Sequence, residues 1–245
     1  MPEVVQTWLD TKSIEATERI QEFILQSYRA DFSKYADNSL SIRIRQVFES
    51  LPAQFAKSND KFTYGVIKNG ARAREYELAI EWLVDAGLVR RVTKVERGDK
   101  IPLKAYEGRQ SFKLYFGDIG LFRRLAEIPA QVIAEKEAIF NQFNGLMAEQ
   151  FVCQQLSNHQ LYYWTSGAAS EVDFVEQIED KIIPIEVKSG RNARAKSLRV
   201  HQERYKPDIA IRFSLLSRKK QEHLLNIPLF EIFLTDKLIE MELEK

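Results

Sequence analysis

The chain has 245 residues, of which 44% are hydrophobic, and 36 Lys and Arg nearly balance 35 Asp and Glu, giving a formal net charge of +1. This length predicts one or two domains with a real core, and the charge alone indicates no particular partner. A single cysteine, Cys153, excludes an internal disulfide framework and fits the reducing cytosol. Without a signal-peptide pattern or a long apolar run, we expect a cytoplasmic protein with no membrane partner.

The first predicted region, residues 1–37, is a helical segment. Apolar residues recur at helical spacing between residues 12 and 36, and Ser13 stands where an N-cap belongs. The polar residues 36–39 then interrupt the pattern, so a second region is expected to begin at residue 38.

The second predicted region, residues 38–108, is a small α+β domain. The pattern predicts three helices and then two strands, over residues 41–55, 65–69, 72–87, 88–95 and 102–107. Gly87 is a natural residue for the end of the third helix. Three short helices followed by a two-stranded hairpin make a winged-helix-like domain.

A winged-helix-like domain often places its third helix in the major groove of DNA. Four basic side chains would then contact nucleic acid: Lys68, Arg72, Arg74 and Arg91. The region holds 13 Lys and Arg against 9 Asp and Glu, which permits such contact without requiring it. The third helix also carries four acidic residues that repel phosphate: Glu75, Glu77, Glu81 and Asp85. The composition therefore favours protein packing or a linker role over sequence-specific DNA recognition.

The third predicted region, residues 109–245, alternates strands and helices, which is typical of an α/β domain with a mixed sheet. The predicted strands cover residues 111–116, 161–165, 171–175, 182–189, 208–214 and 229–234. The predicted helices cover residues 117–128, about 136–157 and 195–205, with Asp118 as the N-cap of the first.

Charged residues interrupt two neighbouring apolar strands of this region. Glu186 and Lys188 project to the same side of their strand, and Asp173 has a similar polar-between-apolar setting. Because residues 176–180 read as a turn, a hairpin would bring Asp173 close to Glu186. Two carboxylates and solvent suit Mg²⁺ or Mn²⁺, and Lys188 could act on the attacking water or on a phosphodiester oxyanion. The alternative is an ordinary salt bridge between strands.

Glu149 lies at helical spacing from apolar residues of the predicted helix 136–157, so it shares an apolar face. A carboxylate there is costly unless a cation or hydrogen bonds meet it. Glu149 could therefore complete the cluster, and the alternative is a partly exposed glutamate beside Gln150.

The order Glu149, Asp173, Glu186-x-Lys188 resembles the PD-(D/E)XK phosphodiesterase superfamily, which has the restriction-endonuclease-like fold. More closely, several segments resemble the uncharacterised domain found after the ATPase core in many prokaryotic AAA-type ATPases: KLYFGDIGLFRRL, GLMAEQFVCQQL, YYWTSGAASEVDFV, PIEVKSG and KSLRVHQERYKPDIAIRFS. MPEVV at the start resembles the end of that core. The resemblance implies the C-terminal part of a larger ATPase, or a product started at an internal methionine, with ATP bound only in a core that this chain lacks.

The resemblance also implies a function and its site residues. Glu149, Asp173 and Glu186 would hold Mg²⁺ or Mn²⁺, and together with Lys188 they would cleave DNA or RNA. A rival interpretation is a regulatory module that keeps the nuclease fold, binds nucleic acid or protein, and does no chemistry. In a third, the site becomes competent only together with the ATPase core, the expected partner.

Other polar and aromatic residues fit less specific roles. Gln202 and Tyr205 follow the site as in some relatives of the superfamily, but their spacing is tighter. His201 is not expected to participate, and His159 and His223 are expected to be solvent-exposed. The aromatic run 162–164 could stack on bases, although a strand that enters a core uses the same residues more often.

Overall fold

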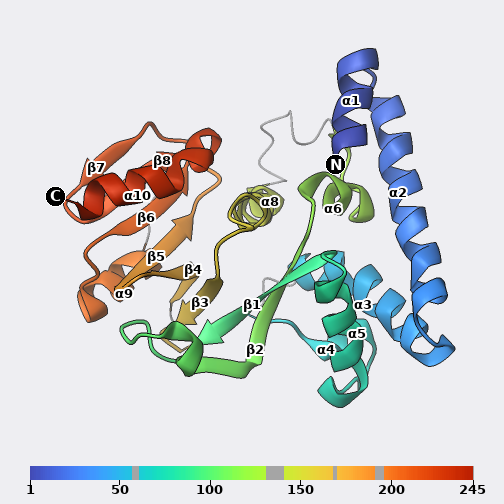
Figure 1. The fold of residues 1–245 in the computed structure, drawn as a ribbon, viewed down its shortest axis with the longest axis horizontal. Coiled ribbons are helices and arrows are strands. Elements are labelled where there is room, and N and C mark those ends of the chain that lie inside the picture. Colours follow the sequence, from blue (N-terminus) through green and yellow to red (C-terminus); the bar gives the residue numbers. More distant parts are fainter. Residues whose placement is uncertain (57–60, 131–140, 168–169, 191–195, 245) are drawn as a thin grey trace. The chain divides into compact units, whose positions relative to one another are not determined.

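The computed structural model describes residues 1–56, 61–130, 141–167, 170–190 and 196–244 (Figure 1). The chain divides into two compact units. The first unit comprises residues 1–91 and 114–140, and the second comprises residues 92–113 and 141–245. These units and the three predicted regions divide the chain at different places.

Helices build the first unit. In chain order they are α1 (Pro2–Thr11), α2 (Ile14–Tyr35), α3 (Asn38–Ala56), α4 (Tyr64–Ile67), α5 (Ala73–Asp85) and α6 (Ile119–Leu125). The predicted helix over 12–36 is confirmed as α2, and the Ser13 hydroxyl accepts a hydrogen bond from the Ala16 N–H at 3.2 Å. The predicted cap of α6 is confirmed too, because the Asp118 carboxylate accepts from the Leu121 N–H at 2.9 Å. Helix α1, which lies beside α2 (Figure 1), falls within the predicted helical segment 1–37, although no separate helix was predicted there.

Aromatic side chains pack edge-to-face in the core of the first unit. The ring of Phe32 on α2 meets the rings of Phe48 on α3 and Trp82 on α5 edge-on, at centroid distances of 5.2 and 5.6 Å. Phe32 and Phe48 are completely buried, and edge-to-face pairs of this kind add to the free energy gained from burial alone. These contacts fix α2, α3 and α5 against one another.

Gly87 ends helix α5 as predicted. Its φ of +69° is in the left-handed region, which glycine adopts without steric cost. The Gly87 N–H donates to the Val84 carbonyl and the Leu88 N–H donates to the Leu83 carbonyl, at 2.9 and 3.0 Å. This pairing is the Schellman arrangement, and it directs the chain into the first strand.

The predicted hairpin differs in its second strand. Strand β1 (Val89–Val95) is as expected, but residues 103–106 form the 3-10 helix η1 (Leu103–Tyr106), and β2 runs over Glu107–Phe116. Pro102 has no N–H for a strand ladder, and the chain turns inward to bury Leu103, whose N–H donates to the Gln177 side chain at 2.8 Å. The predicted strand 102–107 is therefore wrong, and the predicted strand 111–116 is part of β2.

Eight strands among the described residues form one sheet, in the order β2-β1-β3-β4-β5-β6-β8-β7. The remaining strands are β3 (Leu161–Thr165), β4 (Glu171–Ile178), β5 (Lys181–Val187), β6 (Ala210–Ser214), β7 (Lys219–Gln221) and β8 (Leu224–Pro228). The pairs β1/β3, β5/β6 and β6/β8 are parallel, whereas β3/β4, β4/β5 and β7/β8 are antiparallel. The prediction of a mixed α/β fold is confirmed, and the strands of the expected wing belong to this sheet.

Among the described residues of the second unit, three helices and two 3-10 helices accompany the sheet: η1, α8 (Asn141–Gln155), α9 (Lys196–Tyr205), η3 (Leu229–Leu234) and α10 (Thr235–Leu243). The predicted helix 136–157 is seen as α8, while its start at 136–140 lies outside the described residues. Among the described residues no helix combines the length and the hydropathy needed to cross a membrane.

The predicted strand 229–234 is wrong, because these residues form η3. The strand lies earlier, in β8, and ends at Pro228. In η3 Ile232 is buried, whereas Phe230 and Phe233 are 73% and 76% exposed. An apolar run in the sequence normally indicates a buried strand, and here much of it faces solvent.

The core of the second unit includes the aromatic run of β3. Trp164 packs with Val172 and Val175 of β4 and with Leu198 of α9. All three residues of 162–164 are buried, so they fill the core rather than offer faces to bases.

Candidate active site

The β4–β5 hairpin brings Asp173 and Glu186 together. Strand β4 continues three residues beyond the predicted 171–175, whereas β5 begins one residue before the predicted 182–189 and ends two residues earlier, at Val187. The turn is therefore reduced to Glu179 and Asp180. The ladder pairs Phe174 with Ile185, so one further step along it sets Asp173 opposite Glu186. The predicted hairpin is confirmed, and it places the two carboxylates at the end away from the turn.

Asp173 lies in a β-bulge. Tyr162 pairs with Val175 and Trp164 pairs with Val172, so the single residue Tyr163 faces two residues of β4, Asp173 and Phe174. A bulge redirects side chains locally. The Asp173 Oδ2 accepts a hydrogen bond of 2.7 Å from the Val187 N–H, and the carboxylate thereby reaches across to the end of β5.

Glu186 on β5 and Lys188, which directly follows the last residue of β5, form an ion pair. The Lys188 Nζ lies 2.5 Å from the Glu186 Oε1. Glu186 is only 2% exposed, whereas the Lys188 side chain is 31% exposed. The Glu186 Oε2 is buried and has no hydrogen-bond partner in the described part of the protein, so this oxygen is able to bind a further donor or cation.

The pKa values of both carboxyl groups are raised, and burial is the largest cause. Burial raises the pKa of Asp173, although Lys113, Lys188 and the Val187 N–H oppose that rise. Burial and the neighbouring Asp173 raise the pKa of Glu186 to about 8, with Lys188 opposing. Buried acids with strongly shifted pKa values are typical of functional sites.

Lys113 is a site residue that was not predicted. It lies on β2, its side chain is 14% exposed, and it forms ion pairs with Glu171 and, at 4.0 Å, with Glu149. Its Nζ also lies over the Tyr163 ring, 5.3 Å from the centroid. Burial opposes its charge, but Glu149, Glu171 and Asp173 raise the pKa of Lys113 overall. In the sequence Lys113 interrupts the apolar run SFKLYF, the same signal that identified Asp173.

Glu149 lies on α8, and its side chain is 22% exposed. Its neighbours Val152, Cys153 and Leu156 are buried as predicted. Its carboxylate is the one that Lys113 approaches at 4.0 Å. Within the described residues no group of three or more His, Cys, Asp or Glu side chains is placed to hold a metal ion. A cation at this site would therefore be bound by the adjacent carboxylates of Asp173 and Glu186.

A hydrated divalent cation fits this pair. Mg²⁺ binds proteins through one or two carboxylates and keeps several of its waters. The unpartnered Glu186 Oε2 and the raised pKa values of both acids are what such an ion would relieve. Asp173 and Glu186 are thus suited to hold Mg²⁺ or Mn²⁺.

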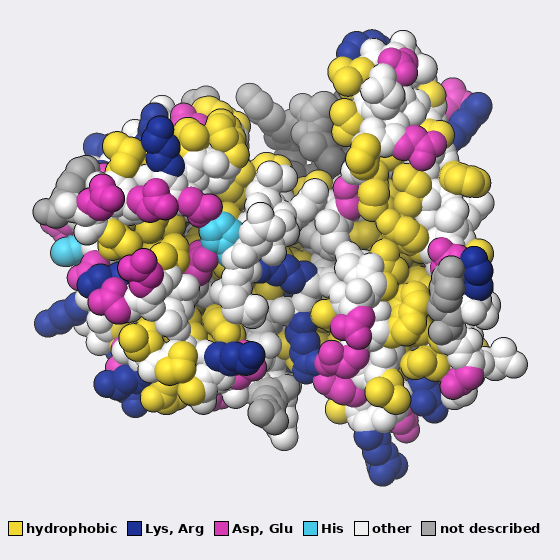
Figure 2. Space-filling model, viewed as in Figure 1, with side chains coloured by type: hydrophobic (Ala, Val, Ile, Leu, Met, Phe, Trp, Pro, Cys, Tyr) yellow, Lys and Arg dark blue, Asp and Glu magenta, His cyan; other side chains and the backbone are white. Residues whose placement is uncertain are grey.

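The predicted nucleic-acid contacts lie in the first unit. Lys68 ends α4 and Arg72 begins α5, and both are exposed, as is Arg74. Arg91 is instead paired with Glu77 and Glu81, each at 2.7 Å. Figure 2 shows basic and acidic side chains interspersed on the face drawn, whereas a nucleic-acid interface usually has a basic stripe.

The histidines fall into different settings. His223 is exposed, as expected. The expectation for His159 is wrong, because its Nδ1 lies 2.5 Å from the Glu176 Oε1 and its Nε2 lies 3.2 Å from the Asp236 Oδ1. His201 is completely buried against Trp164 and Tyr205.

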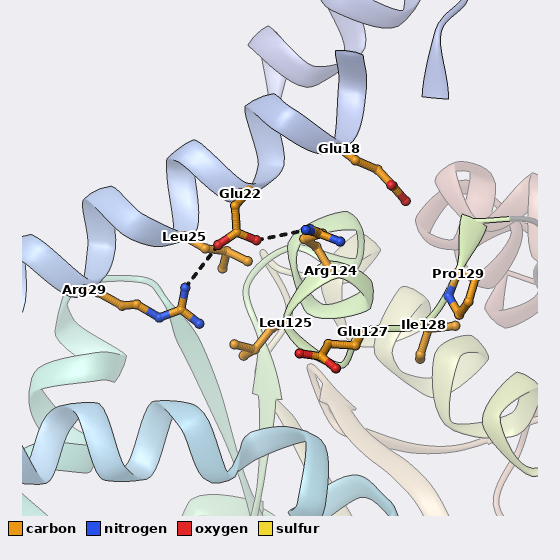
Figure 3. A pocket seen from close by; sticks show the side chains of 9 residues that line it. All are labelled: Glu18, Glu22, Leu25, Arg29, Arg124, Leu125, Glu127, Ile128 and Pro129. Atoms are coloured by element: carbon orange, nitrogen blue, oxygen red, sulfur yellow. Dashed lines mark hydrogen bonds and ion pairs between the residues drawn. The ribbon is translucent and has the colours of Figure 1, made fainter. Parts of the chain in front are cut away.

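The first unit contains a separate cavity of about 440 Å³ (Figure 3). Its lining residues are Glu18, Glu22, Leu25, Arg29, Arg124, Leu125, Glu127, Ile128 and Pro129. Glu22 lies between Arg29 and Arg124, with oxygen–nitrogen distances of 3.6 and 3.2 Å. These charges neutralise one another within the wall, so the cavity presents no single charge to a ligand.

The fold and this site define an α/β protein with a helical unit and a mixed-sheet unit, in which two carboxylates and a lysine meet at one end of a hairpin. The chain belongs to the family described as Domain of unknown function (DUF8612), whose model matches residues 1–132. Residues 144–231 match a second model, Domain of unknown function (DUF4143), and this segment contains Glu149, Asp173, Glu186 and Lys188. No curated protein and no solved structure matches the chain.

Proposed function

We propose that the second unit is a Mg²⁺- or Mn²⁺-dependent phosphodiester hydrolase that cleaves DNA or RNA. The observation that carries the proposal is the adjacency of Asp173 and Glu186, two buried acids with raised pKa values, beside the partly exposed amine of Lys188. The resemblance of the Glu149, Asp173, Glu186-x-Lys188 order to PD-(D/E)XK enzymes supports the same reaction class.

Each residue has a defined task in this proposal. Asp173 and Glu186 hold the cation, and the Val187 N–H keeps the Asp173 carboxylate in position. Lys188 reaches solvent while its Nζ contacts Glu186, so it can donate to a phosphodiester oxygen on which negative charge develops. When bound, the cation polarises the phosphodiester and lowers the pKa of a bound water.

We further propose that this module works beside the core of an AAA-type ATPase. The support is the similarity of five segments, from KLYFGDIGLFRRL to KSLRVHQERYKPDIAIRFS, to the domain that follows such cores. Co-expression with an ATPase core that ends in a motif like MPEVV tests this, and ATP-dependent stimulation of cleavage is expected. Cleavage that is the same with and without the core and ATP contradicts the partnership.

The hydrolase proposal is tested with purified protein, supercoiled plasmid DNA and single-stranded RNA in Mg²⁺ or Mn²⁺. We expect nicking or cleavage that Lys188→Ala abolishes. Lys181→Ala is the matched control, because Lys181 begins the strand that Lys188 directly follows, but it pairs with Asp180 and Asp208 by the turn. Absence of cleavage of both substrates by the native chain, in either metal, contradicts the proposal for the isolated chain.

The burial of the carboxylates favours a second candidate, a regulatory module without chemistry. Asp173 is 8% and Glu186 is 2% exposed, and Lys188 already neutralises part of their charge. Calorimetric titration with Mn²⁺ separates the candidates. Binding that Asp173→Asn removes supports the hydrolase, and the absence of binding supports the regulatory module.

A further inference from the structure

Two lysines and four acids form one charged cluster in the second unit. The acids are Glu149, Glu171, Asp173 and Glu186, and the lysines are Lys113 and Lys188. With every group ionised, the cluster has two net negative charges. A single divalent cation balances them, while a second would leave an excess of positive charge in a buried place, which is costly.

The position of Lys113 divides this cluster in two. Its amine pairs with Glu171 and Glu149, while Asp173 and Glu186 face each other across the hairpin. A buried amine is held in place only by strong partners, and Lys113 has both these acids and the Tyr163 ring. The amine of Lys113 thus lies between the carboxylates of Glu149 on α8 and Glu171 on β4, in the position that a metal ion bridging the two carboxylates would occupy.

We infer that Lys113 is a built-in counter-ion that takes the place of a second divalent cation and limits the site to one metal ion. This inference rests on the proposed function, since it concerns how many ions the same site holds. Two-metal sites need carboxylates around both ions, which lie about 3.5–4 Å apart. Lys113 engages Glu149 and Glu171, the two acids of the cluster other than Asp173 and Glu186.

The experiment is a calorimetric titration of the full chain with Mn²⁺. The native protein is expected to bind one Mn²⁺, and Lys113→Met is expected to bind two, because Glu149 and Glu171 lose their amine. Lys113→Arg keeps the charge and should still bind one. Lys181→Met, which removes a lysine paired with two acids at the other end of the hairpin, should also bind one.

Thermal melting supplies a readout that does not depend on activity. Without metal, Lys113→Met should melt at a lower temperature than the native chain, and Mn²⁺ should raise its melting temperature more than it raises that of the native chain. If Lys113→Met does not fold without metal, it is refolded in Mn²⁺ and its metal content is measured by atomic absorption after gel filtration.

The outcomes separate this inference from the proposed function. If the native chain and Lys113→Met each bind one Mn²⁺, the inference is overturned and the hydrolase proposal is unaffected. The same holds if the native chain binds two Mn²⁺. Absence of Mn²⁺ from every variant overturns both. One in the native chain, two in Lys113→Met and one in each control support the inference.

Discussion

At the scale of single residues, the proposed chemistry depends on how Asp173 is held. The bulge and the 2.7 Å hydrogen bond from the Val187 N–H set its carboxylate beside Glu186. Two acids in such contact repel one another unless a proton or a cation is present. Without a metal ion this repulsion destabilises the folded protein. The free energy of unfolding should therefore depend on the charge of Asp173.

Asp173→Asn tests this repulsion. Asparagine keeps an oxygen that accepts from the Val187 N–H but removes the charge, so the metal-free protein should gain about 1 kcal/mol of stability at neutral pH. Mn²⁺ should stabilise the native chain and leave Asp173→Asn unchanged. Chemical denaturation with and without Mn²⁺ measures both effects, and a metal-free variant less stable than the native chain contradicts the account.

His201 provides a pH-dependent prediction away from the site. Burial lowers the pKa of His201 from its ordinary 6.5 to about 4, and neither ring nitrogen has a hydrogen-bond partner among the described residues. Between these pH values the unfolded chain binds a proton that the folded chain does not, so stability falls as pH decreases from 6.5 to 4. At full effect the loss is about 3 kcal/mol.

His201→Phe should remove most of that loss. Phenylalanine keeps the packing against Trp164 and Tyr205 without a group that must stay neutral. Denaturation at neutral pH and near pH 4 measures the difference, and the exposed His223 supplies the control variant His223→Gln. If native and His201→Phe proteins lose equal stability on acidification, the buried neutral histidine is the wrong explanation.

At the scale of elements, local signals predict helix ends well. Ser13 and Asp118 are N-caps and Gly87 ends α5, as their positions in the sequence indicate. Each signal acts within a few residues, so it can be read from the sequence alone.

Ser13→Ala should destabilise the protein by about 1 kcal/mol, because the Ala16 N–H loses its acceptor at the start of α2. Ser27→Ala on the same helix is the control, since its hydroxyl donates to the Phe23 carbonyl, which remains within the helix ladder. Urea denaturation measures the two variants, and equal effects of the substitutions would contradict a capping role for Ser13.

At least one of the incorrectly predicted elements depends on contacts with residues distant in the sequence. Residues 103–106 turn because Leu103 enters a core with Trp164 and Val172, and residues 229–234 form η3 although their apolar run indicates a strand. The same applies within the site. The β4–β5 pairing spans a short turn and was predictable, whereas the pairing of Lys113 with Glu171 joins residues 58 apart, so the sequence alone does not show it.

At the scale of the whole molecule, a net charge of +1 gives little long-range attraction for nucleic acid. Any affinity should then come from the candidate site rather than from the first unit. If these residues make no phosphate contacts, the triple variant Lys68→Ala, Arg72→Ala, Arg74→Ala should change the affinity for labelled DNA by less than about threefold. The loss of phosphate contacts would also reduce the dependence of the affinity on salt concentration. Fluorescence anisotropy at two salt concentrations measures this, and a large loss with a smaller salt slope would assign DNA binding to α4 and α5.

The most direct test of the central claim is a crystal structure of the chain soaked in Mn²⁺, examined by anomalous scattering. We expect one Mn²⁺ bound by Asp173 and Glu186, and none between Lys113 and Glu171. Diffraction data that show no manganese at Asp173 and Glu186 would contradict a metal-dependent site in this protein.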